Sequence, residues 1–525
     1  MTSISQDARG VERWVLISAI LASAMAFIDQ TALDVASPRL QEDLNMSGTQ
    51  LFWVSTAYAL FLASLLLVGG ALGDLYGRKR VFMIGIGIFT AASVACGFAP
   101  TSEILIGARA IQGIGGALMI PGSLSIISAT FSAEKRGAAI GTWSTFSTVT
   151  TLLGPLLGGW LAERGLWRAV FFVNVPIGII ALYLLASRVP ESRDETGSRK
   201  LDLVGAFLIT ASLALFTIGF TVIQDSTEPL LSALTIGGAV ITLIAFIYTE
   251  SRVEHPMVPL KLFRNRTFAG TNLLTLFLYA ALRVAPFFLG LNLQQIQGYP
   301  ADLAGLTLLP FALCLIALSR LAGGWTNRIG ARTLLTAGPA LTGIGFFMLG
   351  LPGLTSGPAD YWTSFFPGII VLGIGMGLTV APLTTTVMGS APRENAGAAS
   401  GINNAVSRVA AVLALTIIGG IALSNFQGTL SARADSIDLS DSERSEIMTN
   451  SEALGATTAP DGLDEEAQTQ VNEAIKASFL DSYRLVTTIS AVLAWLSALV
   501  AFLLIEPRSK QPDSVENVEP APAMG

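Results

Sequence analysis

The chain has 525 residues, of which 52% are hydrophobic and only 13% are charged, and its mean hydropathy is +0.62. Soluble domains carry about 25% charged residues, so this composition excludes an ordinary soluble protein and predicts a polytopic helical membrane protein. The net charge of −6 is small and gives no support to nucleic-acid binding. Two cysteines in separate apolar stretches and a single histidine argue against a disulfide framework and a multi-histidine metal site.

A short polar arm, residues 1–13, precedes a series of apolar stretches. Each is long enough to cross a hydrocarbon core of about 30 Å as a helix. We expect fourteen of them, at residues 14–35, 52–73, 81–98, 103–126, 137–160, 168–187, 203–223, 231–250, 268–291, 303–325, 333–351, 363–388, 397–424 and 482–505. The predicted fold class is therefore an all-α polytopic membrane protein with 14 transmembrane helices.

These helices group into two halves around an insertion. Residues 14–188 form an N-terminal half of six helices, and residues 268–506 form a C-terminal half of six. Between them, a linker region at 189–267 carries two extra helices, 203–223 and 231–250. In the second half, the polar stretch 426–480 predicts a long periplasmic loop with a short amphipathic helix around Val471, Ile475 and Phe479. The acidic tail, residues 507–525, is expected to be disordered.

The distribution of Lys and Arg gives the orientation in the membrane. Alternate predicted loops collect these residues, and the opposite loops are nearly free of them except for Arg39, Arg164 and the long last loop. Because Lys and Arg remain on the cytoplasmic side, both termini are predicted to face the cytoplasm, with the protein in the cell (inner or plasma) membrane. The cationic loops contain Arg78 to Arg80, Lys135, Arg136, Arg188, Arg193, Arg199, Lys200, Lys261, Arg264, Arg266, Arg328, Arg332 and Arg393.

A glycine- and charge-rich turn, residues 70–80, joins the second and third predicted helices. Gly70 and Gly77 allow helix ends to approach closely, and Asp74 can accept hydrogen bonds from Arg78 or from a neighbouring helix N-terminus. Residues 322–332 repeat the turn weakly, with Gly330 matching Gly77. Parallel repeats of this kind build many secondary transporters, which bind substrate at the midplane between the halves.

The turn at 70–80 resembles the signature loop of transporters of the major facilitator superfamily. Four more stretches extend the likeness toward the fourteen-span drug:proton antiporters of that superfamily, at residues 29–38, 105–115, 154–159 and 167–178. The resemblance implies a major facilitator fold of two six-helix halves with two inserted helices. Two positions depart from the family pattern, since Asp34 stands where Asn is usual and Thr150 stands where Gly often begins the antiporter motif.

Charged residues within the predicted helices are the candidates for proton coupling. A charge near the bilayer centre costs at least about 2.5–3.5 kcal/mol, so it persists where it is paired, protonated or hydrated. Asp29 is the preferred proton carrier, because an apolar cavity disfavours the ionised carboxylate and promotes proton uptake; its alternative role is an interhelical hydrogen bond. Asp34 lies nearer the outer surface and is the second candidate. Arg109 either pairs with an acid, as the resemblance implies, or binds backbone carbonyls.

Other residues are candidates for gating and substrate binding. By resemblance, Gly154, Pro155, Gly158 and Gly159 form an antiporter-type gate, because proline bends a helix and glycine allows close packing. The alternative interpretation is that these four residues serve only close helix packing, which would require the same residue types. Arg283 and Arg408 either bind an anionic substrate group or form structural hydrogen bonds within the second half. The substrate-binding candidates are Arg283, Gln294, Asn403, Asn404 and Arg408.

The sequence thus predicts a proton-coupled exporter of amphipathic or lipophilic compounds that works by alternating access. It predicts no enzyme, no metal and no cofactor, because no catalytic set and no Gly-x-x-x-x-Gly-Lys-Ser/Thr stretch occurs. The proton gradient is the expected energy source and the monomer the expected functional unit. Two alternatives remain open, namely an exporter of a specific lipid, metabolite or anionic compound, and a non-transporting scaffold or sensor.

Overall fold

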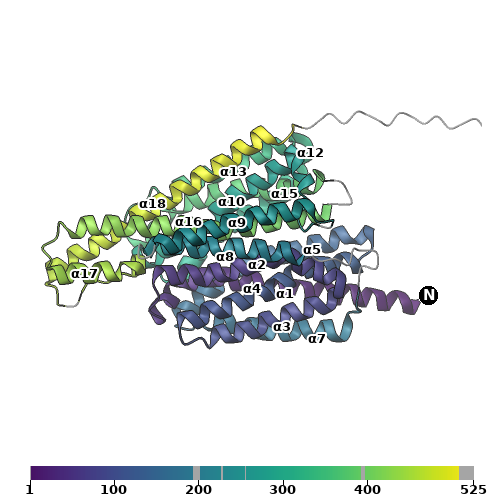
Figure 1. Ribbon diagram of the computed structural model, residues 1–525, viewed down its shortest axis with the longest axis horizontal. Coiled ribbons are helices and arrows are strands. Elements are labelled where there is room, and N and C mark those ends of the chain that lie inside the picture. Colours follow the sequence, from purple (N-terminus) through teal and green to yellow (C-terminus); the bar gives the residue numbers. More distant parts are fainter. Residues whose placement is uncertain are drawn as a thin grey trace, which may run out of the picture.

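The computed structural model describes residues 2–192, 202–225, 229–254, 256–391, 396–460 and 462–507. Within these residues the regular secondary structure is helical and includes no strand. The long helices run side by side along the long axis of the molecule (Figure 1). Helix α1 (Thr2–Asp43) begins, and helix α18 (Glu465–Leu504) ends, at the same end of the bundle (Figure 1). We call this the cytoplasmic end, as the charge distribution predicts, and the opposite end the outer end.

The N-terminal half contains the six predicted helices in their expected order. It contains α1, α2 (Gly48–Tyr76), α3 (Arg78–Gly97), α4 (Ser102–Thr130), α5 (Ala133–Glu163), α6 (Ala169–Phe172) and α7 (Asn174–Arg188). The short α6 and the longer α7 follow one another and together make the sixth helix. Helix α2 begins at a capping box, in which Ser47 and Gln50 each accept a hydrogen bond from the other's main-chain N–H.

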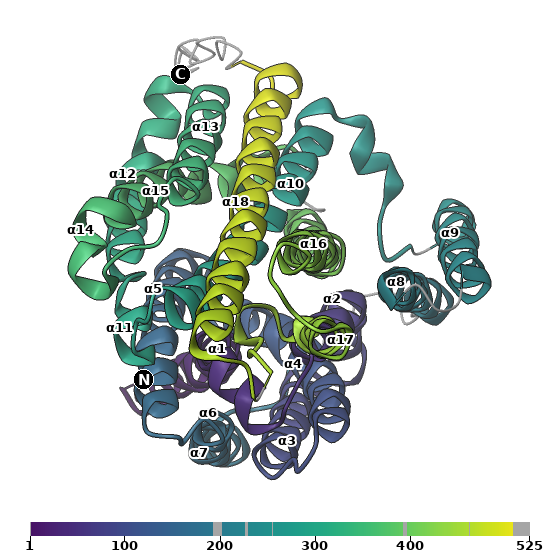
Figure 2. The same cartoon turned by 90° about the vertical axis from the view of Figure 1, so that its left-hand side faces the viewer.

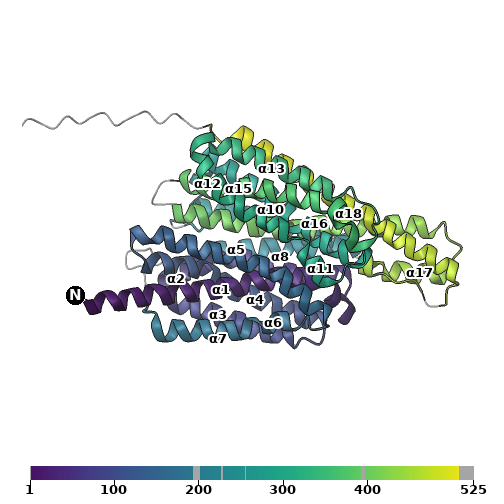
Figure 3. The same cartoon turned by 180° about the vertical axis from the view of Figure 1, so that it is seen from behind.

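The C-terminal half lies beside the first, as seen from the front and from behind (Figures 1 and 3). Polar residues and prolines divide this half into a larger number of helical segments. These segments are η1 (Leu260–Arg264), α10 (Arg266–Leu291), the π-helical turn η2 (Asn292–Ile296), α11 (Ala301–Leu306), α12 (Leu309–Ile329), α13 (Ala331–Leu349), η3 (Gly357–Asp360), α14 (Tyr361–Ser364), α15 (Phe366–Gly389), α16 (Ala396–Ala434), α17 (Asp441–Asn450), η5 (Ser451–Ala456) and α18.

The two inserted helices, α8 (Leu203–Asp225) and α9 (Pro229–Arg252), form an antiparallel pair at the side of the bundle. Helix α8 packs against α2 of the first half and α16 of the second (Figure 2). Much of the outer surface of α9 is apolar and exposed, including Leu234, Ile241 and Ile244. A helix with such a surface is stable where lipid replaces water, so the pair lies at the edge of the helical bundle, next to the bilayer.

The repeated turn predicted from the sequence has the same geometry in both halves. Gly77 ends α2 and starts α3 with φ 109° and ψ 126°, and Gly330 ends α12 and starts α13 with φ 92° and ψ 145°. Each N–H donates to a carbonyl four residues back, at 3.0 Å for Gly77 and 3.1 Å for Gly330. Positive φ favours glycine, which explains the glycine at both turns.

The segment 426–480, expected as a loop with a short amphipathic helix, is instead helical over most of its length. Helix α16 continues to Ala434, and α18 runs unbroken from Glu465 into the last predicted span. No Gly or Pro interrupts residues 465–504, so nothing in the sequence stops the helix there. Val471, Ile475 and Phe479 are each at most 3% exposed, because they face the interior of this outer extension.

Twelve helices among the described residues are long and apolar enough to cross a membrane. Two further predicted spans, 137–160 and 333–351, coincide with α5 and α13, which pack inside the bundle but do not meet this hydropathy criterion. The chain is therefore a helical multi-pass membrane protein. The predicted number of fourteen crossings is not confirmed by composition alone, although each predicted stretch lies mainly on helix.

Candidate functional site

A cavity of about 500 Å³ lies between the two halves. Helices α1 and α5 of the first half line one side, and α10, α11, α12, α15 and α16 of the second half line the other. Most of its lining is apolar, as in small-molecule binding sites generally. Its polar lining residues are Gln30, Thr31, Asp34, Tyr279, Arg283, Gln294, Thr307, Asn404, Ser407 and Arg408.

An ion pair joins the two halves across this cavity. The Asp34 Oδ2 atom on α1 accepts a hydrogen bond from Arg283 Nη1 on α10 at 2.6 Å. The side chains are 25% and 10% exposed, respectively, so the pair is partly desolvated. The other oxygen, Asp34 Oδ1, is buried and has no hydrogen-bond partner among the described residues. One oxygen of this carboxylate thus binds Arg283 of the opposite half, while the second oxygen is free to accept a further hydrogen bond.

The second cavity arginine has weaker contacts. Arg408 Nη1 on α16 donates to Gln30 Oε1 on α1 at 3.3 Å, and no carboxylate among the described residues pairs with it. Among the described lining residues, Asp34 is the one acid against the two cations Arg283 and Arg408. With Asp34 ionised, these three side chains leave one net positive charge in the cavity.

The remaining substrate-binding candidates are divided between the cavity and its surroundings. Gln294 lines the cavity and donates to the Val35 carbonyl at 3.0 Å, and Asn404 lines it as well. Asn403 instead points into the second half, where it donates to Thr275 Oγ1 at 2.8 Å and to Asn272 Oδ1 at 3.2 Å. Among the described residues, Arg283 and Arg408 donate to Asp34 and Gln30 of the opposite half rather than to polar side chains of the second half, where structural hydrogen bonds were expected.

Asp29 lies in a closed polar cluster inside the first half. Its Oδ2 atom is 2.5 Å from Arg109 Nη1, and its Oδ1 atom accepts from Gln112 at 2.8 Å and from Asn174 at 3.0 Å. Asp29 is 0% exposed and Arg109 is 1% exposed. The expected pairing of Arg109 with an acid is therefore present. Both oxygens of Asp29 are occupied, and neither residue lines the cavity between the halves.

Further contacts fix Arg109 within this cluster. Its Nε–H donates to the Val54 carbonyl at 3.2 Å, and its guanidinium carbon lies 4.3 Å from the centre of the Tyr58 ring. Ser93 accepts hydrogen bonds from both Gln112 and Asn174, at 2.8 and 3.2 Å. A buried ion pair needs further hydrogen bonds to offset the desolvation of its two charges, and the neighbouring polar groups of this cluster provide them.

The glycine stretch of α5 provides close packing on two sides. A side-chain carbon at Gly154 or Gly158 would overlap Thr31 or Ala32 of α1. On the opposite half, a side-chain carbon at Gly159 would overlap the Ala301 main chain of α11. The stretch therefore packs closely against the second half at the outer end of the bundle, and its role as a gate stays a prediction.

More hydrogen bonds between the halves lie at the same end. Glu163 Oε2 accepts from the Ala301 N–H at 2.9 Å, which caps α11. Gln41 donates to the Ala453 carbonyl at 3.1 Å and accepts from Gln295 Nε2 at 3.1 Å. Together with the packing of α5 on α11, these contacts hold the two halves together on the outer side of the cavity.

A glycine-to-alanine pair tests the packing of α5. We expect Gly158→Ala to lower the melting temperature of the purified protein by several degrees, because its methyl group would overlap the Ala32 main chain. As a matched control, Gly107→Ala on α4 adds a methyl group in open space and should be neutral or stabilising, since alanine favours helix by up to about 1 kcal/mol. Equal melting temperatures for the two variants would contradict this account of the α1–α5 contact.

The cytoplasmic turn after α2 is held by the segment that follows α7. The Glu191 carboxylate accepts from the N–H groups of Lys79 at 3.0 Å and Arg80 at 3.1 Å, at the N-terminus of α3. The Arg78 N–H donates to the Ser192 carbonyl at 2.9 Å. Gly77 has the positive φ noted above, and a side-chain carbon added at Gly70 would come into ordinary van der Waals contact with Pro121 of α4. The side chain of Asp74 lies outside those that the structure describes.

Several residues of the site had no assigned role in the sequence reasoning. Gln112 and Asn174 lie within stretches that carry the family resemblance, so their position in the sequence was a usable signal. Gln30 follows Asp29 directly, on the cavity side of α1. Tyr279 and Glu191 had no such signal, because aromatic and acidic residues are common on helix surfaces and in loops. Among the described residues, no group of His, Cys, Asp and Glu is arranged to hold a metal ion.

Comparisons with known proteins agree with this architecture. A family model described as the Major Facilitator Superfamily matches residues 19–415. Multidrug resistance protein Stp of Mycobacterium tuberculosis is 33% identical over 428 residues, covering 79% of this chain and 76% of that protein. The probable actinorhodin transporter of Streptomyces coelicolor is 32% identical, with coverages of 85% and 78%. Cephamycin export protein CmcT of Amycolatopsis lactamdurans is 34% identical, with coverages of 79% and 86%.

Solved structures share the fold at lower identity. An inward-facing, unoccupied bacterial homologue of the human lysosomal transporter Spinster aligns with a TM-score of 0.63 and 18% identity, over 93% of this chain and 97% of that one. The xylose transporter XylE from E. coli, in an inward-open conformation, aligns with a TM-score of 0.56 and 14% identity, over 95% and 97%. At these identities the likeness shows the fold alone.

Proposed function

Because the chain belongs to the major facilitator superfamily and is a multi-pass membrane transporter rather than an enzyme, we propose that it exports small amphipathic or lipophilic compounds. The similar proteins named for multidrug resistance and for antibiotic export support this direction and this class of compound. The largely apolar cavity between the halves is the site where such a compound binds. Alternating access then follows from the halves opening in turn around that site.

We assign the proton exchange to Asp34. The single observation that carries this assignment is the state of its two oxygens, since Oδ2 binds Arg283 and the buried Oδ1 has no partner in the part of the chain that the structure describes. A proton on this carboxylate removes its charge and weakens the ion pair with Arg283. Because the pair joins α1 of one half to α10 of the other, taking up and losing a proton changes how tightly the halves hold together.

The cycle follows from competition for this carboxylate. With the outer side closed, as in this structure, Asp34 is paired with Arg283 and a compound binds from the cytoplasmic side. When the halves open outward the pair separates, the compound leaves and Asp34 takes up a proton. After the halves return, the proton leaves to the cytoplasm and the pair forms again. Each charge that moves down the membrane potential contributes about 2.3 kcal/mol per 100 mV.

The energy source, the oligomeric state and the orientation in the membrane are part of the same proposal. The proton gradient is the energy source, and no cofactor takes part. The protein works as a monomer in the inner or plasma membrane with both termini in the cytoplasm, which the cationic loops support. The Asp29–Arg109 cluster holds α1 and α4 together in this conformation, and its role as the proton carrier stays a prediction that variants of the two acids can separate.

A transport assay tests the function. The purified protein is reconstituted in proteoliposomes, a pH gradient is imposed, and the movement of a fluorescent lipophilic compound is followed together with internal pH. We expect uphill movement of the compound coupled to proton flow in the opposite direction, and no movement when the gradient is collapsed. Gradient-independent leakage at the rate of empty liposomes would contradict export, and would favour the scaffold or sensor alternative.

One observation favours the second candidate, an exporter of acidic compounds. Arg408 faces the cavity without a carboxylate partner among the described residues, and a guanidinium group binds carboxylates and phosphates well. Competition in the same assay between matched lipophilic acids, amides and amines distinguishes the candidates. Preference for the acids, lost in Arg408→Gln, would support the acidic cargo; equal competition by all three would support the broader exporter.

A further inference from the structure

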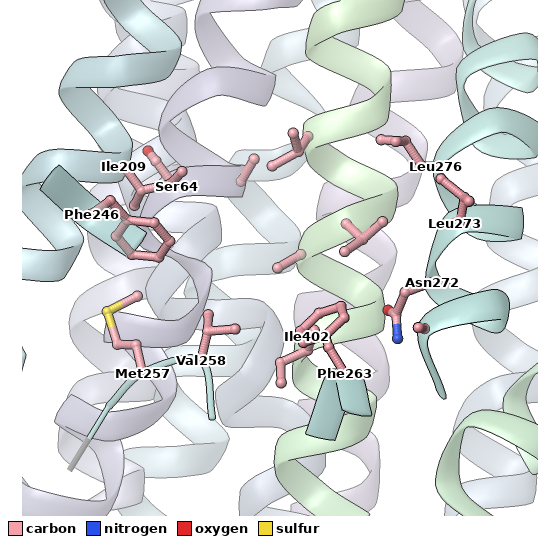
Figure 4. A pocket seen from close by; sticks show the side chains of 15 residues that line it. Ser64, Ile209, Phe246, Met257, Val258, Phe263, Asn272, Leu273, Leu276 and Ile402 are labelled. Atoms are coloured by element: carbon pink, nitrogen blue, oxygen red, sulfur yellow. The ribbon is translucent and has the colours of Figure 1, made fainter. Parts of the chain in front are cut away.

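A second cavity, of about 430 Å³, lies where the inserted pair α8–α9 meets the junction between the halves. It is lined by α2 of the first half, by α8 and α9, and by α10 and α16 of the second half (Figure 4). It shares no lining residue with the central cavity, because α10 and α16 present different faces to the two spaces. The central transport site therefore does not account for it.

The wall of this lateral cavity is almost entirely hydrocarbon. Its two polar residues already use their polar groups elsewhere. Ser64 donates to the Leu60 carbonyl at 2.8 Å, and Asn272 donates to the Phe268 carbonyl at 2.8 Å and accepts from Asn403 at 3.2 Å. A space of this kind in a membrane protein binds an apolar chain and gives a polar ligand nothing to pair with.

The cavity lies toward the cytoplasmic side of the bundle. Met257, Val258 and Phe263 close one end of it (Figure 4), and they belong to the segment that joins the end of α9 to the start of α10. This segment is anchored by Glu250, whose Oε2 accepts a hydrogen bond from the Val258 N–H at 3.0 Å. Both the end of α9 and the start of α10 are at the predicted cytoplasmic boundary, so the cavity is at the depth of the cytoplasmic leaflet.

Cations lie beside that end of the cavity. Phe263, which lines it, is part of the short helix η1, and the same helix carries Lys261 and Arg264. Arg266 follows as the first residue of α10. All three cations are exposed, and no carboxylate among the described residues forms an ion pair with them. Cationic groups at the cytoplasmic edge of a membrane helix attract anionic lipid headgroups.

We propose that the lateral cavity is a binding site for an anionic phospholipid of the cytoplasmic leaflet. One acyl chain occupies the cavity, and the headgroup phosphate binds Lys261 and Arg264 on η1. The chain then contacts α2 of one half, α10 and α16 of the other, and the inserted pair, so the lipid is a structural part of the junction along which the halves move. The site is independent of the transported compound and of the acid that carries the proton.

Lipid binding to the full-length protein tests the proposal. The purified protein is titrated in detergent with phosphatidylglycerol and with phosphatidylcholine of identical chains, and the bound lipid is counted by native mass spectrometry. We expect one phosphatidylglycerol to be retained in preference to phosphatidylcholine. In Lys261→Ala/Arg264→Ala its affinity should fall roughly 25-fold, since each of the two cations near an anionic lipid contributes about a fivefold factor.

Three controls complete the test. Ala405→Phe, which places a ring in the cavity, should lose the bound lipid while Lys261 and Arg264 remain. Arg328→Ala removes an exposed cation from another cytoplasmic turn and should leave binding unchanged. Glycerol-1-phosphate, a headgroup analogue without chains, should not compete, which excludes a site for free phosphate. Equal retention of the two lipids, or unchanged retention in the double cation variant, which alters only exposed side chains, would overturn the proposal.

Discussion

Asp34→Asn is expected to abolish the proton-driven component of export while leaving the protein folded. Asparagine has nearly the same shape as aspartate but neither binds a proton nor carries the charge that pairs with Arg283. The charge left without a carboxylate partner is that of Arg283, whose side chain is 10% exposed but lines the cavity rather than a closed cluster, so we expect a smaller stability loss than at Asp29. In proteoliposomes, the rate of movement of the compound should become independent of the imposed pH gradient, and substrate-dependent proton flow should disappear.

The same assay contains its own controls. Asp34→Glu keeps a titratable carboxylate and should retain part of the coupling. Asp438→Asn removes an exposed acid from the outer extension and should behave as the unaltered protein. Full gradient-driven export by Asp34→Asn, together with a normal melting temperature, would remove Asp34 from the mechanism and make Asp29 the preferred proton carrier.

Asp29→Asn is expected to act mainly on stability. It leaves Arg109 charged and 1% exposed, with an amide in place of its carboxylate partner. Removing one member of a buried ion pair typically costs about 3–5 kcal/mol, because the remaining charge has lost its compensation. We therefore expect a low folded yield and a melting temperature lowered by more than that of any other variant proposed here, as measured by size-exclusion chromatography and thermal unfolding.

A double substitution separates the charge from the contact. Asp29→Asn/Arg109→Gln removes both charges and should recover much of the stability that the single change loses, which gives a coupling energy by a double-mutant cycle. The folded fraction of either variant should still couple export to the proton gradient. If Asp29→Asn instead folds normally and loses proton exchange, then the buried acid carries the proton and Asp34 serves to join the halves.

The helical architecture could be predicted from the sequence because its signals are local. Apolar length places each helix, Lys and Arg bias gives the orientation, and the glycines at Gly77 and Gly330 mark two turns whose positive φ few other residues adopt. The outer extension was less predictable. Its helices continue through a polar sequence, and the burial of Val471 and Phe479 depends on contacts with distant parts of the chain.

The partners within the site could not be predicted from the sequence. Asp34 and Arg283 are 249 residues apart, and Arg408 and Gln30 are 378 apart, so only the packing of the two halves brings them together. Position along a helix placed Asp29 within the membrane-spanning part, and its side chain is 0% exposed in the structure. The position of a residue along a helix did not show whether its side chain lies in a closed polar cluster or lines an open cavity. That difference depends on which neighbouring helix the side chain faces.

The outer extension has a practical consequence for structural work on this protein. At about 1.5 Å per residue, the 40 residues of α18 span about 60 Å, roughly twice the hydrocarbon thickness of a bilayer. About half of that helix therefore projects as a rigid rod beyond a detergent micelle, next to α17. Particle images of a small transporter usually lack such a landmark for alignment. A nanobody against α17 would enlarge this landmark. Because η5, which follows α17, packs against α1 and α2 of the first half and against α16 and α18 of the second, binders could be sorted by the conformation they trap.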